Sequence, residues 1–472
     1  MTKTSPPTVP TASGPAFDTL KLPPAMLGNL QQLGYHNMTP IQAASLPLTL
    51  GGGDVIAQAK TGSGKTAAFG LPLLTKLNPR HLGVQAMVLC PTRELADQVT
   101  QELRRLARYM HNIKILTLVG GSTMRPQRES LGFGAHIVVG TPGRIMDHLE
   151  RGSLELNALN TLVLDEADRM LDMGFYDSIA YVVKRCPHAR QTLMFSATYP
   201  DGVTRLARQF MHQPQEVKLV EQHDDSKIRQ HFYEVRRETR LPAVAALLKH
   251  YRPVSTLAFC NTKQQCRDLL DLLHVEGIHA LTLNGDMEQR ERDQVLIQFA
   301  NRSCSVLVAT DVAARGLDIA QLEAVINVDV TPDPEVHIHR IGRTGRADAA
   351  GSALNLVSPA EMGRIDNIAK LMGVTPEWED IDALQREHNA PLLPPMATLQ
   401  ILGGRKEKIR PGDVLGALTG EAGFTREQVG KITVTDMSTY VAVTRDIAYE
   451  AVKRLNAGKV KGKTVKVRVL EG

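Results

Sequence analysis

Residues 59–66 read Ala59-Lys60-Thr61-Gly62-Ser63-Gly64-Lys65-Thr66, and this glycine-rich stretch is the most informative part of the sequence about the fold. It directly follows a short apolar run that predicts a strand, and it opens a stretch with helical periodicity. In that context the glycines let backbone N–H groups converge on phosphate oxygens, and the amino-terminal end of the helix favours their negative charge. We therefore predict that all eight residues bind a nucleotide within an α/β fold. A chance glycine turn is the alternative, but it does not explain the Gly-Lys-Thr ending.

A second motif supplies the acidic partner that such a site needs. Lys65 is expected to reach the β- and γ-phosphates, and Thr66 to ligate Mg²⁺. One hundred residues after Lys65, the apolar run at 161–164 ends in Asp165-Glu166-Ala167-Asp168. Open α/β sheets bind ligands at the carboxyl ends of their strands, so Asp165 is placed to hold Mg²⁺ and Glu166 to orient and deprotonate the attacking water. An acidic pair that caps a helix is the alternative.

The rhythm of apolar runs predicts two α/β domains in tandem. Short apolar runs alternate with longer helical stretches over residues 16–219, and the same rhythm restarts over residues 220–374. This pattern is typical of parallel sheets covered by helices. Residues 1–15, rich in Thr, Ser and Pro, are expected to form a disordered tail. The proline-bearing segment 375–396, which contains Trp378, is expected to be a linker.

The last segment, residues 397–472, has a different order and a different charge. Its patterns predict strand, helix, two strands, helix and strand, which is the ferredoxin-like arrangement that RNA-recognition motifs also use. It holds 14 Lys and Arg against 8 Asp and Glu, whereas the rest of the chain is close to neutral. A basic excess confined to one terminal domain indicates a polyanionic ligand. A merely solvated surface is the alternative.

Composition narrows the remaining classes. The chain has 472 residues, of which 43% are hydrophobic and 22% charged, close to the averages for globular proteins. No apolar run is long enough to span a bilayer, and the amino terminus lacks the pattern of a signal peptide. The five cysteines are scattered without a C-x-x-C pair, which argues against disulfides and zinc. We expect a cytoplasmic protein that does not bind membranes.

The phosphate loop and Asp165–Asp168 together resemble the DEAD-box family of RNA helicases. Thr39-Pro40-Ile41-Gln42 looks like the family's Q motif, in which Gln42 would select adenine and Phe17 would stack on the base. The resemblance therefore implies ATP, with Mg²⁺, as the cofactor. Over residues 17–373 it implies two RecA-like domains that couple RNA-stimulated ATP hydrolysis to local unwinding of short RNA duplexes.

The resemblance also implies an RNA-binding set of residues in each helicase domain. These residues grip phosphates and ribose hydroxyls, so the binding they provide does not depend on base sequence. They are Arg93, Gly121, Thr141 and Arg144 in the first domain, and Thr262, Thr310 and Arg315 in the second. One departure is Asn284, where many members of the family have histidine.

Further matches concern hydrolysis itself. The resemblance implies that Arg343 and Arg346 are arginine fingers, which stabilise charge on the transferring γ-phosphoryl group. Asp318 matches a family residue near the ATP ribose. Ser196, Thr198 and His339 belong to motifs that couple hydrolysis to strand separation.

The C-terminal segment resembles the RNA-binding domain of a bacterial branch of this family that acts on ribosomal RNA. The target implied is the hairpin 92 region of 23S ribosomal RNA, near the peptidyl-transferase centre, in precursors of the large (50S) subunit. Tyr440 is the one aromatic residue on the middle strands, and it can equally be a packed side chain. Basic loops are better candidates for the RNA contacts, namely Arg405, Lys406, Lys408, Arg410, Lys461 and Lys463.

Two other functions compete with an RNA helicase. A DNA translocase shares the two-domain engine, but it is not expected to combine Gln42, Asp165–Asp168 and an RNA-binding tail. A non-enzymatic RNA-binding scaffold conflicts with the complete set of catalytic motifs. The sequence does not specify an oligomeric state.

Overall fold

The computed structural model describes residues 14–59, 63–121, 123–199, 201–218, 228–314, 322–345, 351–384 and 390–470. Residues 1–13 of the expected tail 1–15 and the site residues Lys60, Thr61, Gly62, Arg315, Asp318 and Arg346 lie outside these ranges. The Pro15 carbonyl accepts from the Met38 N–H at 2.9 Å, so the end of the expected tail is ordered. The described chain divides into two compact units, residues 14–218 and 228–470.

The first unit is a seven-stranded sheet in the order β3-β4-β2-β5-β6-β1-β7, with every neighbouring pair parallel. Its strands are β1 (Val55–Gln58), β2 (Ala86–Leu89), β3 (Ile115–Leu118), β4 (Ile137–Gly140), β5 (Thr161–Asp165), β6 (Gln191–Ser196) and β7 (Gln215–Lys218). Its helices are α1 (Pro24–Gln32), α2 (Pro40–Leu50), α3 (Lys65–Thr75), α4 (Arg93–Leu106), α5 (Met124–Gly132), α6 (Pro142–Glu150), α7 (Ala167–Asp172), α8 (Tyr176–Val183) and α9 (Asp201–Phe210).

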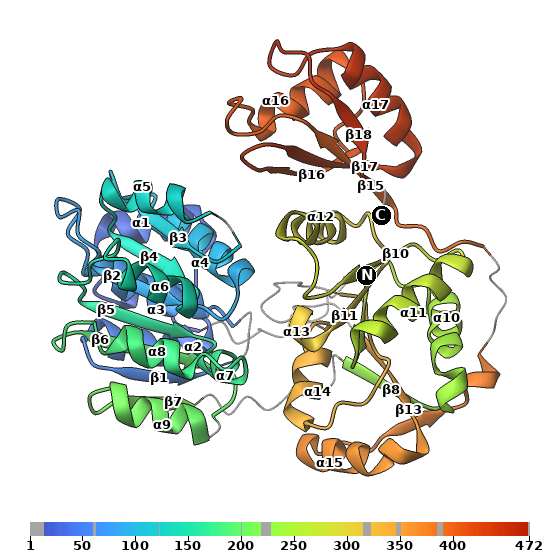
Figure 1. The fold of residues 1–472 in the computed structure, drawn as a ribbon, viewed down its shortest axis with the longest axis horizontal. Coiled ribbons are helices and arrows are strands. Elements are labelled where there is room, and N and C mark those ends of the chain that lie inside the picture. Colours follow the sequence, from blue (N-terminus) through green and yellow to red (C-terminus); the bar gives the residue numbers. More distant parts are fainter. Residues whose placement is uncertain are drawn as a thin grey trace, which may run out of the picture. The chain divides into compact units, whose positions relative to one another are not determined.

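Helices cover both faces of this sheet (Figure 1). Successive residues of a strand point to opposite faces, so Val55 and Ala57 pack with α1 to α4, whereas Ile56 packs with α6 to α9. Burial on both faces explains why central strands such as β2 and β5 are almost continuously apolar rather than alternating. The two apolar layers fix the sheet, and the sheet fixes the strand ends that carry the polar motifs.

The second unit begins with another seven-stranded parallel sheet, in the order β10-β11-β9-β12-β13-β8-β14. Its strands are β8 (Ile228–Glu234), β9 (Thr256–Cys260), β10 (Ala280–Leu283), β11 (Val306–Thr310), β12 (Ala324–Asn327), β13 (Gly351–Val357) and β14 (Glu377–Glu379). Its helices are α10 (Arg240–Tyr251), α11 (Lys263–Val275), α12 (Gln289–Ala300), α13 (Asp311–Ala314), α14 (Pro334–Ile341) and α15 (Met362–Met372). Helices α10 and α11 cover one face, and α14 and α15 cover the other.

Strand β14 lies inside the segment 375–396 that the sequence led us to expect as a linker. It pairs in parallel with β8 as the edge strand of the sheet. The Tyr233 hydroxyl donates to Glu379 Oε2, His231 Nδ1 lies 2.5 Å from Glu379 Oε1, and Trp378 packs near Phe232. The first part of this segment therefore belongs to the second helicase domain.

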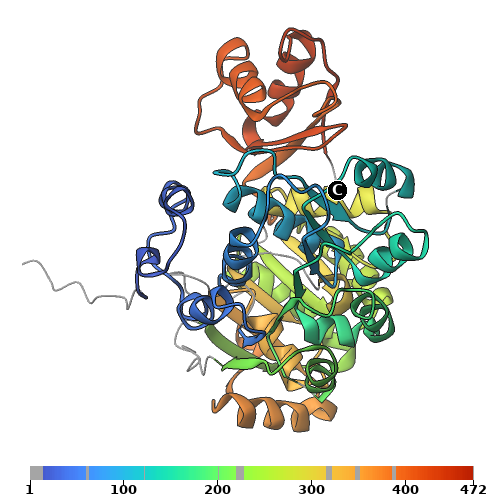
Figure 2. The ribbon, with the colours of Figure 1, turned by 90° about the vertical axis from the view of Figure 1, so that its left-hand side faces the viewer.

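The C-terminal domain has the β-α-β-β-α-β order that its sequence predicts. It consists of β15 (Met396–Ile401), α16 (Pro411–Gly416), the π-helical turn Ala417–Glu421, β16 (Val429–Val434), β17 (Thr439–Thr444), α17 (Ala448–Ala457) and β18 (Val467–Val469). The sheet is antiparallel, in the order β16-β17-β15-β18, and its two helices cover one face (Figures 1 and 2). On β18, Val467 is buried and Arg468 exposed, as the alternation predicts.

No helix in the described part of the chain is long and apolar enough to cross a membrane. All five cysteines are buried and unpaired.

Candidate active site and nucleic-acid interface

The edge of the first sheet where β1 and β5 end carries the predicted catalytic pair. Lys65 opens α3 after the loop that follows β1, and Asp165 ends β5. They are 6% and 3% exposed, and within the described residues Lys65 Nζ and Asp165 Oδ1 have no hydrogen-bond partner. Burial raises the pKa of Asp165 to about 6, and the nearby charge of Lys65 opposes that rise. Buried charged groups that lack hydrogen-bond partners among the described residues fit a charged ligand, and a magnesium-bound triphosphate offers a cation to Asp165 and an anion to Lys65.

The described end of the phosphate loop rests on the Q motif. Gly64 has φ +91°, and a Cβ at this position would lie 2.4 Å from Gln42 Nε2. The Gln42 amide donates to the Gly64 carbonyl at 3.0 Å and accepts from the Thr39 N–H at 2.9 Å. Gln42 is buried, and its amide therefore holds the loop and caps α2 at once. Adenine selection by Gln42 remains a prediction.

Other predicted nucleotide residues surround this loop. The Ala59 N–H donates to the Ser196 carbonyl at 2.9 Å, which ties the loop to β6. Phe17 is buried, and its ring lies 6.1 Å from that of Tyr35 in an edge-on arrangement. Ser63 is half-buried before α3, and Thr66 lies in its first turn. The structure thus packs Phe17 into the core, and base stacking by this ring remains a prediction.

The acidic tetrapeptide makes two separate connections. Glu166 has φ +52°, a conformation uncommon for a residue with a side chain, and its Oε2 accepts from Arg169 at 2.8 Å. Asp168 Oδ2 accepts from the Thr198 N–H at 2.8 Å and from the Thr198 hydroxyl at 2.9 Å. The Ser196 hydroxyl in turn accepts from the Asp168 N–H at 3.2 Å. The structure therefore joins the acidic motif to the predicted coupling residues.

Asp168 contacts the predicted coupling residues, although the sequence motif assigned it no role of its own. Its position after Asp165 and Glu166, at the start of a helix, was the available signal.

In the first domain the predicted RNA residues form two contacts. Gly121 has φ +72°, and a Cβ there would lie 1.5 Å from an Arg93 guanidinium nitrogen, so the guanidinium lies directly against this glycine. Thr141 precedes α6, and Arg144 in the first turn of that helix donates to Gln127 at 3.1 Å. Arg93, Gly121, Thr141 and Arg144 all follow strands or open helices at the carboxyl edge of the sheet.

Gln127 on α5 holds Arg144 in place, and no sequence motif indicated it. Its Oε1 also lies 2.9 Å from His148 Nε2, and its Nε2 donates to the Val119 carbonyl at 3.0 Å. Burial and, after it, the positive charge of the neighbouring Arg144 lower the pKa of His148 to about 4. A neutral His148 can donate to Gln127 and accept from Ser153, which completes the network.

In the second domain two threonines occupy corresponding strand ends. Thr262 follows β9, and its Oγ1 accepts from the Gln265 N–H at 3.1 Å, which caps α11. Thr310 ends β11, and its Oγ1 accepts from the Ala313 N–H at 3.4 Å. In each case the hydroxyl oxygen is engaged as an acceptor, which leaves the hydroxyl proton to donate to a phosphate.

The motif that holds the predicted arginine finger is anchored by a different arginine. Arg340 is 1% exposed, and its guanidinium donates to both oxygens of Asp311 at 2.7 Å. It also donates to the Asp329 carbonyl at 2.8 Å. His339 is half-buried on the same helix, and Arg343 is buried in the turn that follows α14. Arg340 therefore fixes the helix that ends beside Arg343.

The C-terminal domain brings its two predicted basic loops together. Lys461 Nζ donates to the Lys408 carbonyl and lies 3.5 Å from Asp413. All six predicted RNA residues of this domain are exposed, namely Arg405, Lys406, Lys408, Arg410, Lys461 and Lys463. Loops separated by fifty residues in sequence thus form a single basic surface.

Tyr440 is the packed side chain that the sequence left as one alternative. It is 5% exposed, and its hydroxyl accepts from Gln294 at 3.4 Å and from Gln400 at 3.3 Å. Beside it, the Thr398 hydroxyl lies 2.6 Å from that of Ser303 in the second helicase domain. This part of the sheet face packs against protein, and RNA binding by the basic loops remains a prediction.

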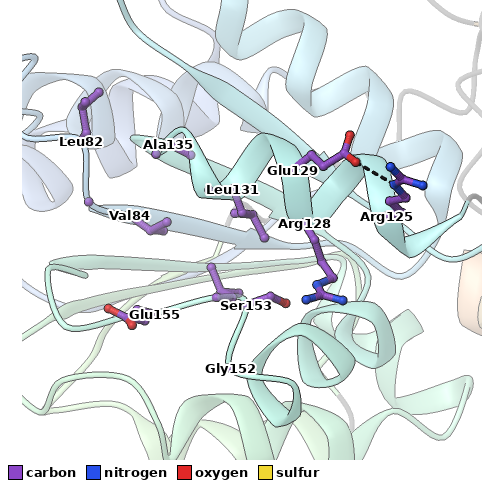
Figure 3. Close-up of a pocket in the computed structure, with 14 residues that line it drawn as sticks. Leu82, Val84, Arg125, Arg128, Glu129, Leu131, Ala135, Gly152, Ser153 and Glu155 are labelled. Atoms are coloured by element: carbon purple, nitrogen blue, oxygen red, sulfur yellow. Dashed lines mark hydrogen bonds and ion pairs between the residues drawn. The ribbon is translucent and has the colours of Figure 1, made fainter.

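A separate cavity of about 750 Å³ lies in the first domain (Figure 3). Its lining includes Leu82 and Ala135 before β2 and β4, and residues of α5, where Arg125 and Glu129 form an ion pair at 2.8 Å. These positions are at the amino ends of the strands, so the cavity lies at the edge of the sheet opposite to Asp165.

Family comparisons match three segments of the chain. The DEAD/DEAH box helicase model matches residues 39–206, the helicase conserved C-terminal domain matches 239–348, and the DbpA RNA binding domain matches 398–469. The last is the bacterial branch that the basic segment was expected to resemble.

Individual relatives agree with these matches. The ATP-dependent RNA helicase DbpA of Escherichia coli is 52% identical over 457 residues, which cover 97% of this chain and 100% of the relative. The DEAD-box ATP-dependent RNA helicase CshA of Geobacillus kaustophilus is 42% identical over 75% of this chain and 76% of its own length. The solved structure of Saccharomyces cerevisiae Dbp5 bound to RNA and ADP BeF3 is 31% identical, with a TM-score of 0.71 over 78% of this chain and 96% of that one.

Proposed function

Because the chain belongs to the DEAD-box family of ATP-dependent RNA helicases, we propose that its C-terminal domain directs this activity to the hairpin 92 region of 23S ribosomal RNA during assembly of the 50S subunit. The enzyme binds ATP and RNA and couples ATP hydrolysis to RNA unwinding. The observation that carries the targeting proposal is the single exposed basic surface formed by residues 405–410 and 459–463. It belongs to a domain that matches the RNA-binding domain of DbpA.

For the chemical step we propose that Asp165 and Thr66 hold Mg²⁺ and that Lys65 binds the terminal phosphates. Bound Mg²⁺ would neutralise phosphate charge. Glu166 would orient and deprotonate the attacking water, because its carboxylate lies beside Asp165 and is held by Arg169. Lys65 Nζ and Asp165 Oδ1 are buried and have no hydrogen-bond partner among the described residues, which supports this assignment.

For the coupling of RNA to hydrolysis we propose that the seven family-matched residues of the helicase domains bind the RNA backbone. ATP and RNA together would bring Arg343, with Arg346, to the γ-phosphate. The Asp168 contacts with Ser196 and Thr198 would transmit this change to the RNA side. The threonine hydroxyls at the strand ends support phosphate rather than base contacts, so sequence preference must come from the C-terminal domain.

The cellular setting follows from the target. We propose that the protein acts in the cytoplasm on precursors of the large ribosomal subunit, and that the C-terminal domain raises the local concentration of the helicase domains at their substrate. Neither a DNA translocase nor a non-enzymatic scaffold accounts for the match to a full-length RNA helicase.

The test is an ATPase assay with a hairpin 92 fragment and a scrambled RNA of equal length. The wild-type protein should reach half-maximal stimulation at a concentration of the hairpin at least about tenfold lower, because contacts specific to the hairpin add to the phosphate contacts that both RNAs can make. Replacing Arg405 and Lys406 by Ala should narrow that difference, while Lys453→Ala, on α17, serves as the matched basic control. Equal half-saturation by both RNAs with the wild-type protein would refute the proposed target.

A further inference from the structure

A buried ionic cluster in the second helicase domain lies outside the helicase motifs. It consists of Arg240 on α10, Asp329 after β12 and Glu361 before α15, which are 7%, 7% and 8% exposed. The Arg240 guanidinium donates a hydrogen bond from Nη1 to Asp329 Oδ1 and another from Nη2 to Glu361 Oε2. Burial alone would raise the pKa of Glu361, but hydrogen bonds from Arg240 and Ser358 outweigh it and lower the pKa. Burying three charged groups costs stability, so a cluster of this kind is expected to have a role besides stability, and the other contacts of Asp329 indicate that role.

Asp329 binds the loop that carries Thr262. Strand β12 is the neighbour of β9 in the sheet, so Asp329 emerges beside Asn261, the first residue after β9. Asp329 Oδ2 accepts from the Asn261 N–H at 3.0 Å, and Oδ1 accepts from Gln265 Nε2 at 3.1 Å. One carboxylate therefore holds both the residue before Thr262 and the residue whose N–H binds the Thr262 hydroxyl.

The same cluster reaches the arginine-finger helix through a separate atom. Arg340 uses the carbonyl of Asp329, not its carboxylate, and also donates to Asn261 Oδ1 at 3.3 Å. Removing the Asp329 carboxylate thus leaves the direct bonds of Arg340 in place. Loss of the Asp329 carboxylate should therefore change mainly the position of the loop that carries Thr262.

We propose that Asp329, held by Arg240 and Glu361, is a positioning residue for RNA binding that fixes the Asn261–Thr262 backbone and aims the Thr262 hydroxyl. This inference rests on the proposed RNA contact of Thr262. In Asp329→Asn the amide must place an N–H against Arg240 or against the Asn261 and Gln265 donors, so one of these contacts is lost. Hydrogen bonds to charged groups are the strong ones, and the loop loses its fixed geometry.

The experiment measures, for the full-length protein, the RNA concentration that gives half-maximal ATPase activity and the KM for ATP. We expect Asp329→Asn to raise the RNA half-saturation roughly fivefold to tenfold, with the ATP KM and the rate at saturating RNA within about twofold of wild type. Tyr233→Phe is the matched control. It removes a buried hydrogen-bonding hydroxyl from β8 of the same sheet, and it should leave the RNA half-saturation unchanged.

A double-mutant cycle with Thr262→Ala separates positioning from general damage. Positioning predicts that Asp329→Asn adds little to the RNA half-saturation once Thr262→Ala is present. Additive effects, or an equal shift in Tyr233→Phe, would overturn the positioning role. An unchanged half-saturation in Asp329→Asn, with a shift in Thr262→Ala, would overturn it and leave the RNA contact of Thr262 standing.

Two further outcomes are decisive. An unchanged half-saturation in Thr262→Ala would remove Thr262 from RNA contact and overturn both claims. Should Asp329→Asn fail to fold, Gln265→Met is the variant to measure. The half-buried Gln265 side chain is hydrogen-bonded to both Asp329 and Asn261, and methionine removes both hydrogen bonds with little change in volume. A rise of about twofold or more in that variant supports the inference, and no rise overturns it.

Discussion

Glu166 and Asp168 are two positions apart, yet the backbone gives them different neighbours. Glu166 sits in the left-handed region and turns its carboxylate to Arg169, whereas Asp168 at the start of α7 binds the residues after β6. The apolar run before Asp165 was sufficient to predict that these carboxylates lie at a strand end. It could not predict the partner of Asp168, because that partner is thirty residues away and is chosen by the sheet order β5-β6.

Replacing Glu166 by Gln tests the water-activating role at the residue scale. The amide cannot accept the proton from water, so ATP turnover should fall by about 10²-fold to 10⁴-fold, with affinities for ATP and RNA preserved. Steady-state ATPase rates and equilibrium binding measure both quantities. Glu155→Gln, an exposed carboxylate at the opposite edge of the sheet, is the control and should retain its turnover. Hydrolysis at the wild-type rate in Glu166→Gln would remove Glu166 from this role.

Gly121 offers a second test at this scale. In Gly121→Ala the new methyl group would overlap the Arg93 guanidinium, and the backbone at φ +72° would be strained as well. Arg93 must move, so the RNA half-saturation should rise roughly tenfold while the ATP KM is unaffected. Gly132→Ala, where an added Cβ meets no atom within 4 Å, should behave like wild type in the same assay. Equal RNA affinity in Gly121→Ala and wild type would contradict a role for Arg93 in RNA binding.

At the level of secondary-structure elements, β14 is a strand that the sequence pattern did not predict. All three of its residues are exposed, so no apolar alternation indicated a strand, and the flanking prolines favoured a linker. Its place in the sheet comes from pairing with β8 and from Glu379, which lies near His231, Tyr233 and Tyr251. Central strands such as β9 and β11 were predictable because burial on both faces makes their sequences almost continuously apolar.

Glu379 links this element to pH. Burial alone would raise its pKa, but hydrogen bonds from Tyr233 and His231 outweigh burial and lower the pKa below its ordinary value of 4.5. A lowered pKa means that the ionised form stabilises the folded state, so this contribution is complete above about pH 4.5 and is lost as the pH falls.

We therefore expect Glu379→Gln to lower the free energy of unfolding at pH 7 and to differ less from wild type at pH 4. Urea unfolding at the two pH values measures the difference. Glu377→Gln, on the same strand, is the matched control and should differ little from wild type at either pH. A loss for Glu379→Gln that is equal at both pH values would contradict the ionic contribution.

At the scale of the whole molecule, the fold could be predicted, and so could the positions of Asp165 and Thr310 at the ends of β5 and β11, whereas the catalytic and RNA-binding roles of the motif residues stay predictions. The three-domain order and the basic C-terminal segment were also readable from composition and periodicity. The buried cluster around Asp329 was not, because Arg240, Asp329 and Glu361 are separated by up to 121 residues and meet only in the folded sheet. Gln127 could not be predicted either, because its partners Arg144 and His148 lie on a different helix and meet it only in the folded domain.

Removing residues 397–472 tests the division of labour between the domains. The truncated chain keeps every motif residue of the helicase domains, so ATP hydrolysis with generic RNA should persist, whereas preference for the ribosomal hairpin should disappear. ATPase titrations with generic RNA and with the ribosomal hairpin measure both quantities. The truncated chain also carries Ser303→Ala, because truncation removes Thr398, the hydrogen-bond partner of the Ser303 hydroxyl. A preserved preference after truncation would place target recognition in the helicase domains.

The most direct test of RNA unwinding directed by the C-terminal domain is a strand-separation assay. The substrate is a short RNA duplex joined to hairpin 92, and the matched substrate carries a scrambled hairpin. We expect the wild-type protein to separate the first duplex at least about tenfold faster, only with ATP, and to lose this activity in Arg343→Ala. Equal rates on the two substrates, or separation that persists without ATP, would contradict the account.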